Sequence, residues 1–225
     1  MKLSILVPVY NERATIRDVL ARLEAVPYEK EIIVVDDCST DGTSDILSSW
    51  RSASVRVIRH ARNRGKGAAI RTGIAQATGD IVIFQDADLE YDPGEYPALL
   101  APILKNEAEV VYGSRFRKKG QWYNLAQYLA NRFLTLLTRL LYGGTLSDMG
   151  VCYKVFIAPL LKSIPLRASG FDIDSEVTAK VLKRKARIVE VPVSYRSRSY
   201  AEGKKARWQD GLIHIRSLIR YRFAD

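Results

Sequence analysis

Short apolar runs alternate with amphipathic segments along the first half of the chain, and this alternation limits the fold more than any other feature. Strands are predicted at residues 2–9, 31–35, 55–58, 81–84 and 110–115. Helices are predicted between them, beginning near residues 12, 41, 65 and 93. Strands joined by helices through short connections are typical of a parallel or mostly parallel sheet with helices on its faces. The sequence therefore predicts an α/β fold of this kind.

Beyond Arg115 the pattern changes, and residues 121–142 are predicted to form one long apolar helix. Apolar side chains cover most of its circumference, and the polar ones are confined to a narrow stripe. That stripe contains Asn131, Arg132, Thr135, Thr138 and Arg139. Such a helix either packs into a core or lies on a membrane with its polar edge turned inward. We favour core packing, because long apolar helices are usually buried.

The rest of the chain is predicted to contain strands at 151–156 and 187–195, a helix at 173–183 and a last helix at 206–223. The last helix has one apolar face with arginines outside it, so it is basic and amphipathic. Residues 180–225 contain 13 Lys or Arg and 4 Asp or Glu, a balance of +9 in a chain whose net charge is +10. Such an excess implies an anionic partner: nucleic acid, a phosphorylated ligand or anionic lipid.

Length and composition add few limits. A chain of 225 residues can form one large domain or two small ones. The two cysteines, Cys38 and Cys152, lie far apart, which fits a reducing cytoplasm and neither a disulfide framework nor a metal cluster. The apolar run at the start is too short for a signal peptide. No stretch of about 18 uninterrupted apolar residues occurs, so no membrane-spanning helix is predicted.

Two carboxylates follow the predicted strand 81–84. Asp86 and Asp88 come where that strand ends, and open α/β sheets bind ligands at the carboxyl edge. Residues two apart on an extended chain project to the same side, so both could reach one divalent cation, with Glu90 a further step along. Oxygen ligands with no Cys or His nearby suit Mg²⁺ or Mn²⁺.

Polar clusters at 8–12, 36–41 and 86–90 should meet at this edge. The first two could contact a base and ribose, with Asp37 the best candidate, and the third could hold a metal on a diphosphate. Neither a GxGxxG after the first strand nor a GxxxxGK[ST] motif occurs, so a dinucleotide fold and a P-loop are not supported. The sequence Gly65-Lys66-Gly67 is only weakly similar to a phosphate loop, and a plain helix start is favoured there.

Taken in order, these motifs resemble family-two glycosyltransferases with the GT-A fold, in the branch of dolichyl-phosphate mannose synthase and related polyprenyl-phosphate sugar synthases. The resemblance extends over nearly the whole chain. It rests on the motifs Val7–Glu12, Ile33–Asp37, Gly65–Gly67, Asp86–Leu89, Gly113–Arg115, Phe171–Glu176, Arg187–Tyr195, Arg198 and Gly203–Lys204.

The resemblance implies one catalytic domain over 1–225, with a nucleotide-sugar and metal half at 1–118 and an acceptor half with membrane-facing helices at 119–225. The implied nucleotide-binding residues are Pro8, Tyr10, Glu12, Asp37, Asp86, Ala87 and Asp88. The implied metal ligands are Asp86, Asp88 and Glu90. Catalytic roles would fall to Asp86, Asp88, Arg115, Arg132, Arg198 and Lys204, the arginines and lysine gathering phosphate charge.

The implied reaction is an inverting, metal-dependent transfer of a hexose from GDP-mannose or UDP-glucose to a polyprenyl or dolichyl phosphate. A phosphate monoester is already anionic at neutral pH, so it can attack without a general base. The implied setting is the cytoplasmic face of a membrane, with the protein bound peripherally and an anchoring subunit as a further candidate partner. Nucleic acid is not expected as a partner.

Other interpretations stay open at this point. A soluble glycosyltransferase acting on a saccharide or protein hydroxyl would need a base, and Asp148 is the first candidate. Arg115 could instead be an ion-pair partner that stabilises the fold. A nucleic-acid-binding module would explain the basic end but not the acidic strand ends, because carboxylates repel nucleic acid.

The chain also departs from the family pattern. Glu90 stands where some relatives carry Gln, many relatives continue into transmembrane helices, and the sequence around Lys204 differs from the commoner Gly-x-Ser-Lys form.

Overall fold

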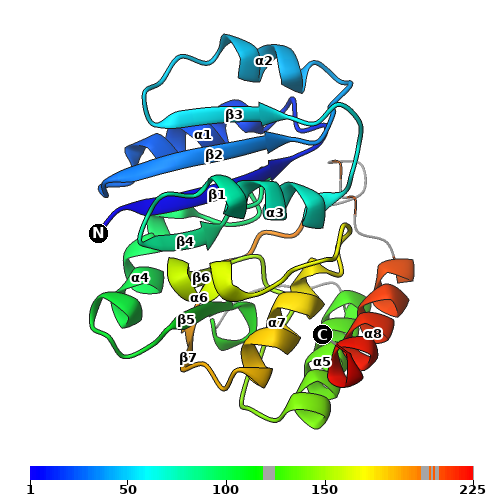
Figure 1. Ribbon diagram of the computed structural model, residues 1–225. Coiled ribbons are helices and arrows are strands. Elements are labelled where there is room, and N and C mark those ends of the chain that lie inside the picture. Colours follow the sequence, from blue (N-terminus) through cyan, green and yellow to red (C-terminus); the bar gives the residue numbers. More distant parts are fainter. Residues whose placement is uncertain (119–124, 199–202, 204, 206–207, 225) are drawn as a thin grey trace.

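The computed structural model describes residues 1–118, 125–198, 203, 205 and 208–224. Its centre is a seven-stranded sheet with the order β3-β2-β1-β4-β6-β5-β7 (Figure 1). The strands are β1 Leu3–Val9, β2 Lys30–Asp36, β3 Val55–Arg59, β4 Ile81–Phe84, β5 Val110–Ser114, β6 Lys154–Ile157 and β7 Ile188–Pro192. The predicted mostly parallel sheet is confirmed, because only the two pairings made by β6 are antiparallel.

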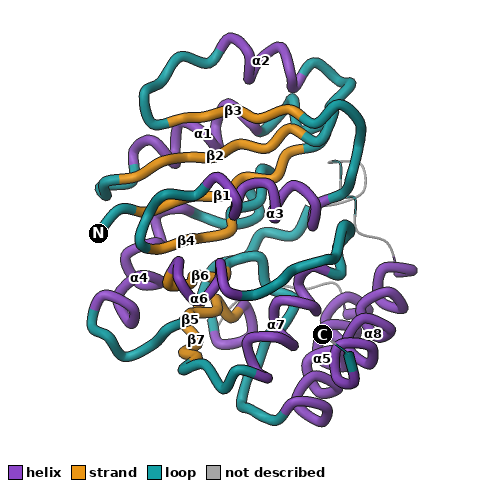
Figure 2. Tube along the Cα trace, viewed as in Figure 1, coloured by secondary structure: helices purple, strands orange, loops and turns teal. Residues whose placement is uncertain are grey.

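Helices lie on both faces of this sheet (Figure 2). The α-helices are α1 Ile16–Ala25, α2 Thr43–Ser49, α3 Lys66–Gln76, α4 Tyr96–Leu104, α5 Leu125–Tyr142, α6 Ala158–Ser163, α7 Ile173–Lys183 and α8 Trp208–Phe223. Short 3₁₀ turns occupy Pro93–Glu95 and Arg115–Arg117. The short helix α6 was not predicted, and the first residues of the predicted segments 121–142 and 206–223 lie outside the described residues.

The apolar runs that predicted the strands form the core. Every residue of β4 and β5 is buried, as are all but one of β1. Helix α3 comes close to β1 because Gly73 has no side chain; a Cβ there would lie 3.1 Å from Leu6 Cδ2. The parallel register of β1 with β2 and β4 brings the ends of these three strands to one edge, which positions the loops that follow them.

Helices α5 and α8 pack on each other and on α7, at the end of the molecule away from β3 (Figure 1). A small apolar cluster centred on Leu134, Met149 and Leu218 joins them, separate from the main core. On α5 the buried side chains are Leu134, Thr135 and Thr138, so its threonines turn inward.

The favoured core packing of this apolar helix is therefore wrong. Its large apolar side chains Leu125, Leu129, Phe133, Leu136 and Leu140 are exposed. The hydrogen bond from Thr138 Oγ1 to the carbonyl of Leu134, at 2.8 Å, satisfies that inward hydroxyl, so the threonines of the polar stripe can be buried at low cost, while Arg132 and Arg139 stay exposed. Within the described residues, no helix combines the length and apolar character needed to cross a membrane.

Candidate active site

Three loops meet at the carboxyl edge of the sheet, after β1, β2 and β4, and side chains tie them together. Asn11 N–H donates to Ser39 Oγ and Glu12 N–H to Thr43 Oγ1, both at 2.9 Å, which joins the first loop to the second. Thr15 Oγ1 donates to the carbonyl of Ala87 at 2.7 Å, which joins the first to the third. The predicted convergence of the three polar clusters is therefore present in the structure.

Asp37 is buried at the end of β2 and holds a neighbouring loop. Its Oδ1 accepts hydrogen bonds from His60 Nδ1 at 2.6 Å and from the Arg64 amide at 2.9 Å, and its Oδ2 accepts one from the Gly65 amide at 2.7 Å. A carboxylate offers about four lone-pair positions, so these three donors leave little capacity for a nucleoside. Asp37 thus fixes the turn into α3, and His60, to which no role was given, takes part.

The Gly65-Lys66-Gly67 turn places a cation on the predicted metal ligand Asp86. Gly65 has a φ of +89°, and a Cβ there would lie 2.3 Å from the carbonyl oxygen of Ser169, so only glycine fits. Lys66, the first residue of α3, points its ammonium at Asp86 Oδ1, 2.7 Å away. Although burial opposes its charge, the adjacent Asp86 holds the pKa of Lys66 well above its usual value.

Asp88 lies close to other carboxylates. Burial, with Asp86 and Glu90 nearby, raises the pKa of Asp88 to about 7, although Arg198 opposes the shift. Its Oδ1 accepts a hydrogen bond from the Glu90 amide at 3.1 Å. Asp88 is therefore short of positive charge for its burial.

The structure does not group Glu90 with the two aspartates as a three-ligand set. Leu89 has a φ of +60°, so the chain leaves the extended path on which side chains two apart share a side. Glu90 Oε1 instead accepts the Arg198 amide at 2.9 Å. Among the described residues, no three His, Cys, Asp or Glu side chains are grouped as metal ligands.

Arg198 connects three carboxylates that come from two loops. Its Nη1 lies 3.0 Å from Glu12 Oε2, its Nη2 lies 2.9 Å from Asp88 Oδ2, and its Nε lies 3.7 Å from Glu90 Oε1. Lys205 reaches the same place, 2.5 Å from Glu12 Oε1, and also donates to the carbonyl of Tyr10. Arg198 and Lys205 therefore bring positive charge to the acidic edge.

The donor chemistry of this edge suits a divalent ion that completes its coordination with other molecules. Asp86 and Asp88 supply hard oxygen ligands two residues apart, and Mg²⁺ is commonly held by one or two carboxylates with water and substrate phosphates. Lys66 and Arg198 lie against the same two carboxylates. A metal would therefore have to share the two carboxylates with these cations or displace the cations from them.

Arg115 forms a separate, buried ion pair with Asp148. Its Nε and Nη2 lie 2.7 Å from Asp148 Oδ2 and Oδ1, a two-point contact, and its amide also donates to Oδ2 at 3.1 Å. Asp148 is completely buried. This geometry favours the fold-stabilising role for Arg115, and it leaves Asp148 unsuited to act as a general base.

Other carboxylates of the second half are likewise matched to cations. Asp174 lies 2.5 Å from Lys154 Nζ, Glu176 lies 2.8 Å from Lys180 Nζ, and Glu190 lies 3.0 Å from Arg117 Nη2. Those three side chains are at most 13% exposed. Each of these three charges is therefore neutralised by a partner within the protein.

The remaining candidates are spread more widely. Pro8 and Tyr10 are half-buried at the end of β1, and the guanidinium of Arg132, on α5, lies 5.7 Å from the centre of the Phe116 ring. Lys204 lies outside the described residues.

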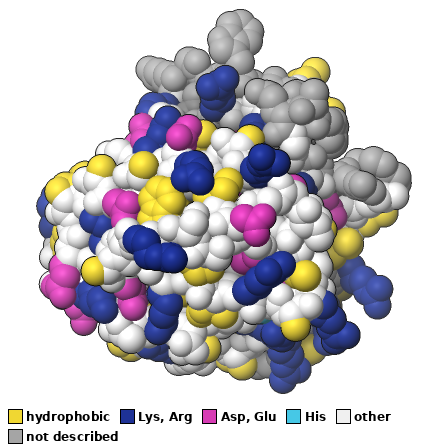
Figure 3. All heavy atoms as spheres, turned by 90° about the horizontal axis from the view of Figure 1, so that it is seen from above, with side chains coloured by type: hydrophobic (Ala, Val, Ile, Leu, Met, Phe, Trp, Pro, Cys, Tyr) yellow, Lys and Arg dark blue, Asp and Glu magenta, His cyan; other side chains and the backbone are white. Residues whose placement is uncertain are grey.

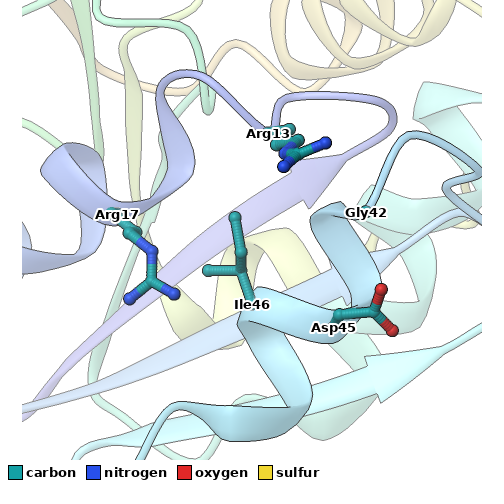
Figure 4. Close-up of a pocket in the computed structure, with 5 residues that line it drawn as sticks. All are labelled: Arg13, Arg17, Gly42, Asp45 and Ile46. Carbon is teal, nitrogen blue, oxygen red and sulfur yellow. The ribbon is translucent and has the colours of Figure 1, made fainter.

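A shallow pocket lies nearby, lined by Arg13, Arg17, Gly42, Asp45 and Ile46 (Figure 4). It contains none of the carboxylates proposed to hold a metal.

Two site residues were missed by sequence reasoning. Lys66 sits in a motif that was judged weak, and its partner Asp86 is distant in the chain. Lys205 was passed over in favour of its neighbour Lys204. Both lysines lie in short basic sequences close to a glycine. Because the acidic strand ends predict a site that needs positive charge, these basic sequences could have been assigned to that site.

Comparison with known proteins agrees with this geometry. The model of the family described as "Glycosyl transferase family 2" matches residues 4–164. Over 91% of the chain, 31% of residues are identical to a dolichol-phosphate mannosyltransferase of Pyrococcus furiosus, of which the chain spans only 59%. The chain is equally similar to an undecaprenyl-phosphate mannosyltransferase of Micrococcus luteus, with 31% identity over 91% of the chain, and it covers 87% of that enzyme.

Solved structures show the same fold. All of the chain aligns with glucosyl-3-phosphoglycerate synthase of Mycobacterium tuberculosis crystallised with phosphoglyceric acid, at a TM-score of 0.75 and 25% identity, covering 81% of that chain. Mannosyl-3-phosphoglycerate synthase of Rubrobacter xylanophilus has a TM-score of 0.76 at 20% identity, with 98% of this chain and 72% of that chain covered. The predicted GT-A type of sheet is thus confirmed. The extent of the family match and the identity to both mannosyltransferases show that the chain belongs to glycosyltransferase family 2.

Proposed function

We propose that the protein transfers a hexose from a nucleotide sugar to a polyprenyl phosphate. The observation that carries this proposal is the meeting of Asp86 and Asp88 with Lys66, Arg198 and Lys205 at one edge of the sheet. Carboxylates there suit a metal-bound diphosphate, and the cations suit the phosphate groups of donor and acceptor. The similarity to two enzymes named for transfer to lipid phosphates supports the acceptor class.

The donor half of this proposal rests on the loops after β1, β2 and β4. Pro8 lies at the end of β1 and Tyr10 and Glu12 in the loop that follows it, where a nucleoside could bind beside the Asp37-held turn. Asp86 and Asp88 would bind Mg²⁺ or Mn²⁺, and the ion would stabilise the negative charge on the departing nucleoside diphosphate. GDP-mannose and UDP-glucose are the two donors to test first.

The acceptor half rests on chemistry that needs no base. An oxygen of the lipid phosphate attacks the anomeric carbon, the bond from that carbon to the diphosphate oxygen breaks, and the diphosphate leaves with the electron pair. This single displacement inverts the anomeric centre. The engagement of Asp148, Asp174 and Glu176 with buried cations supports an acceptor that is already ionised.

The basic segment around Arg198 would gather the acceptor phosphate. Arg198 now spans Glu12, Asp88 and Glu90, and a metal on Asp88 would free part of its charge for a phosphate. Lys204, and Arg132 on α5, are further candidates for the same charge. Such an acceptor resides in a membrane, so the protein would act peripherally at a cytoplasmic membrane face.

The test uses purified protein, labelled GDP-mannose and UDP-glucose, a polyprenyl phosphate in detergent, and Mg²⁺ or Mn²⁺. We expect label in the organic phase with one donor, its loss with EDTA, and its loss in Asp88→Asn. Asp18→Asn, an exposed carboxylate on α1, is the matched control and should keep full transfer.

Label that appears only on a water-soluble acceptor would contradict the lipid acceptor. A hydroxyl acceptor needs a base, and Asp148, the first candidate from the sequence, is closed by Arg115. Label on the water-soluble acceptor that depends on the metal would establish the second reaction.

A further inference from the structure

We propose that the outer surface of α5 and α8 docks on an anionic lipid bilayer; this rests on the proposed lipid-phosphate acceptor and names the surface that meets it. We call this surface the α5–α8 face. Its apolar members are Leu125, Leu129, Phe133, Leu136, Leu140, Leu212, Ile213, Ile219 and Phe223.

Exposed apolar side chains are concentrated on this face. Of the twelve large apolar side chains exposed among the described residues, nine belong to it, and the other three are Met1, Val57 and Leu104. Exposure reaches 75% at Leu140 and 82% at Phe223. Seen from the α2 side, apolar side chains instead form small separate areas among charged ones (Figure 3). A contiguous apolar surface on a folded protein marks an interaction site.

The spacing of these residues follows the helical repeat. On α5 they recur at intervals of three or four residues, which makes one continuous stripe. On α8, Leu212, Ile219 and Phe223 form a second stripe, opposite the buried Leu218 and Tyr221. Both helices pack on α7 and on each other (Figure 1), and the exposure of the side chains in the two stripes places them on the outer sides of these helices.

Charge identifies the occupant of this face as anionic. Helix α5 contains Arg132 and Arg139 and no Asp or Glu. Helix α8 contains Arg216, Arg220 and Arg222 against a single acid, Asp210. Apolar side chains flanked by arginines suit the boundary between acyl chains and anionic headgroups, where each basic residue adds attraction. A protein partner would need an acidic surface that complements these arginines. The experiment below distinguishes such a partner from a bilayer.

The position of α5 connects the face with the site. Its inner side contacts the segment that leads to Arg198, because Gln127 Nε2 donates to Tyr195 Oη at 3.3 Å. Arg115 Nη2 likewise donates to Asn131 Oδ1 at 3.4 Å. A bilayer on the outer side of α5 would therefore lie one helix thickness from Tyr195, in the segment that leads to Arg198.

The experiment is sedimentation of the full chain with vesicles of phosphatidylcholine alone or with about one third phosphatidylglycerol. We expect binding to the anionic vesicles that weakens several-fold as salt rises, since exposed charges are screened. Phe133→Gln with Leu136→Gln, and separately Leu212→Gln with Phe223→Gln, should each weaken binding about tenfold, given the free energy of transfer of such side chains. Arg220→Gln with Arg222→Gln should weaken binding to anionic vesicles only.

The control variants make the same types of substitution outside the α5–α8 face. Val57→Gln with Leu104→Gln, and Arg22→Gln with Arg51→Gln, should bind vesicles like the unchanged protein. Circular dichroism and thermal melting check that each variant is folded. Failure of the unchanged protein to bind anionic vesicles overturns the proposal, as does equal binding by the face variants. The proposal is also overturned if the unchanged protein is a dimer in solution, the face variants are monomers, and neither binds vesicles.

A water-soluble, short-chain prenyl phosphate separates this proposal from the transfer reaction. Face variants should keep transfer to that acceptor while losing transfer to a long-chain acceptor in vesicles. Vesicle binding without transfer to either acceptor would refute the proposed function alone, and transfer to both without vesicle binding would refute the docking face alone.

Discussion

The two edges of the central sheet both hold carboxylates, in opposite electrostatic states. At the amino edge, burial opposes ionisation of Glu31, but hydrogen bonds from Ser4 and Thr78 and the charge of Lys2 outweigh it and lower its pKa to about 2. At the carboxyl edge, burial with Asp86 and Glu90 raises the pKa of Asp88 to about 7. The charge of Glu31 is satisfied by its neighbours, whereas Asp88 lies among an excess of negative charge.

The difference lies in what surrounds each carboxylate. Glu31 Oε1 accepts from Ser4 Oγ at 2.6 Å, the Thr78 amide at 2.5 Å and the Gly79 amide at 3.1 Å, all fixed neutral donors. Asp88 shares Arg198 with Glu12 and Glu90. A dedicated set of donors stabilises a fold, whereas a shared cation leaves carboxylates that an arriving metal or phosphate can rearrange.

The largest expected effect is at the carboxyl edge. Asp88→Asn should reduce transfer about a thousandfold, because it removes a proposed metal ligand while keeping the side-chain shape. Its melting temperature without metal should not fall, since the crowded charge is gone. Scanning calorimetry with Mn²⁺ provides a second readout: the ion should raise the melting temperature of the unchanged protein but not of Asp88→Asn. Equal Mn²⁺ effects on both proteins would contradict the assignment.

Lys66 should come next. Lys66→Met should lower transfer about a hundredfold, because the cation 2.7 Å from Asp86 helps to place that carboxylate and adds positive charge near the diphosphate. Lys66→Arg should restore part of the rate. The exposed Lys105→Met serves as the control in the same assay. An unchanged rate in Lys66→Met would mean that the ion pair only supports the fold.

At the amino edge the expected effect falls on stability alone. Glu31→Gln should lower the free energy of unfolding by about 1–2 kcal/mol, because several hydrogen bonds to a charged acceptor are weakened. Urea titration measures this loss, and transfer below the melting range should be unchanged. A loss of transfer without a loss of stability would place Glu31 in the site and erase the contrast between the edges.

The smallest effect is the dependence of these differences on pH. Glu31 has a folded pKa below its unfolded value, so its contribution is present above pH 4.5 and is lost as pH falls towards 2. Asp88 has a folded pKa above its unfolded value, so the metal-free protein should lose stability as pH rises from about 4 to about 7. Urea titrations in EDTA should therefore show the effect of Glu31→Gln shrinking in acid and the gain from Asp88→Asn growing towards neutral pH. Parallel curves would show that the edges do not differ.

Most of the sheet could be predicted from the sequence, because apolar runs bounded by turn residues locate buried strands directly. The strand 81–84 is found where it was expected, followed by Asp86 and Asp88. The direction of β6 could not be predicted, since an apolar run reads the same in either orientation. The exposure of α5 could not be predicted either, because an apolar helix has the same pattern in a core and on a lipid surface.

Within the site, residue types were easier to predict than their partners. Glu90 follows the two aspartates in sequence, but the left-handed backbone at Leu89 turns it towards Arg198, and leucine gives no sign of such a turn. Arg115 was identified as a cation near phosphate, whereas its two-point contact with Asp148 depends on a pairing 33 positions apart.

The reversed strand β6 has a consequence for how the chain is made. It lies between β4 and β5, so a strand from the second half separates two strands of the first. A nascent chain that has left the ribosome only as far as residue 118 would have both β4 and β5 without the neighbour that joins them. These two strands can be joined only after residue 157 has emerged, so the segments that contain β4 and β5 should become protected from protease together during synthesis.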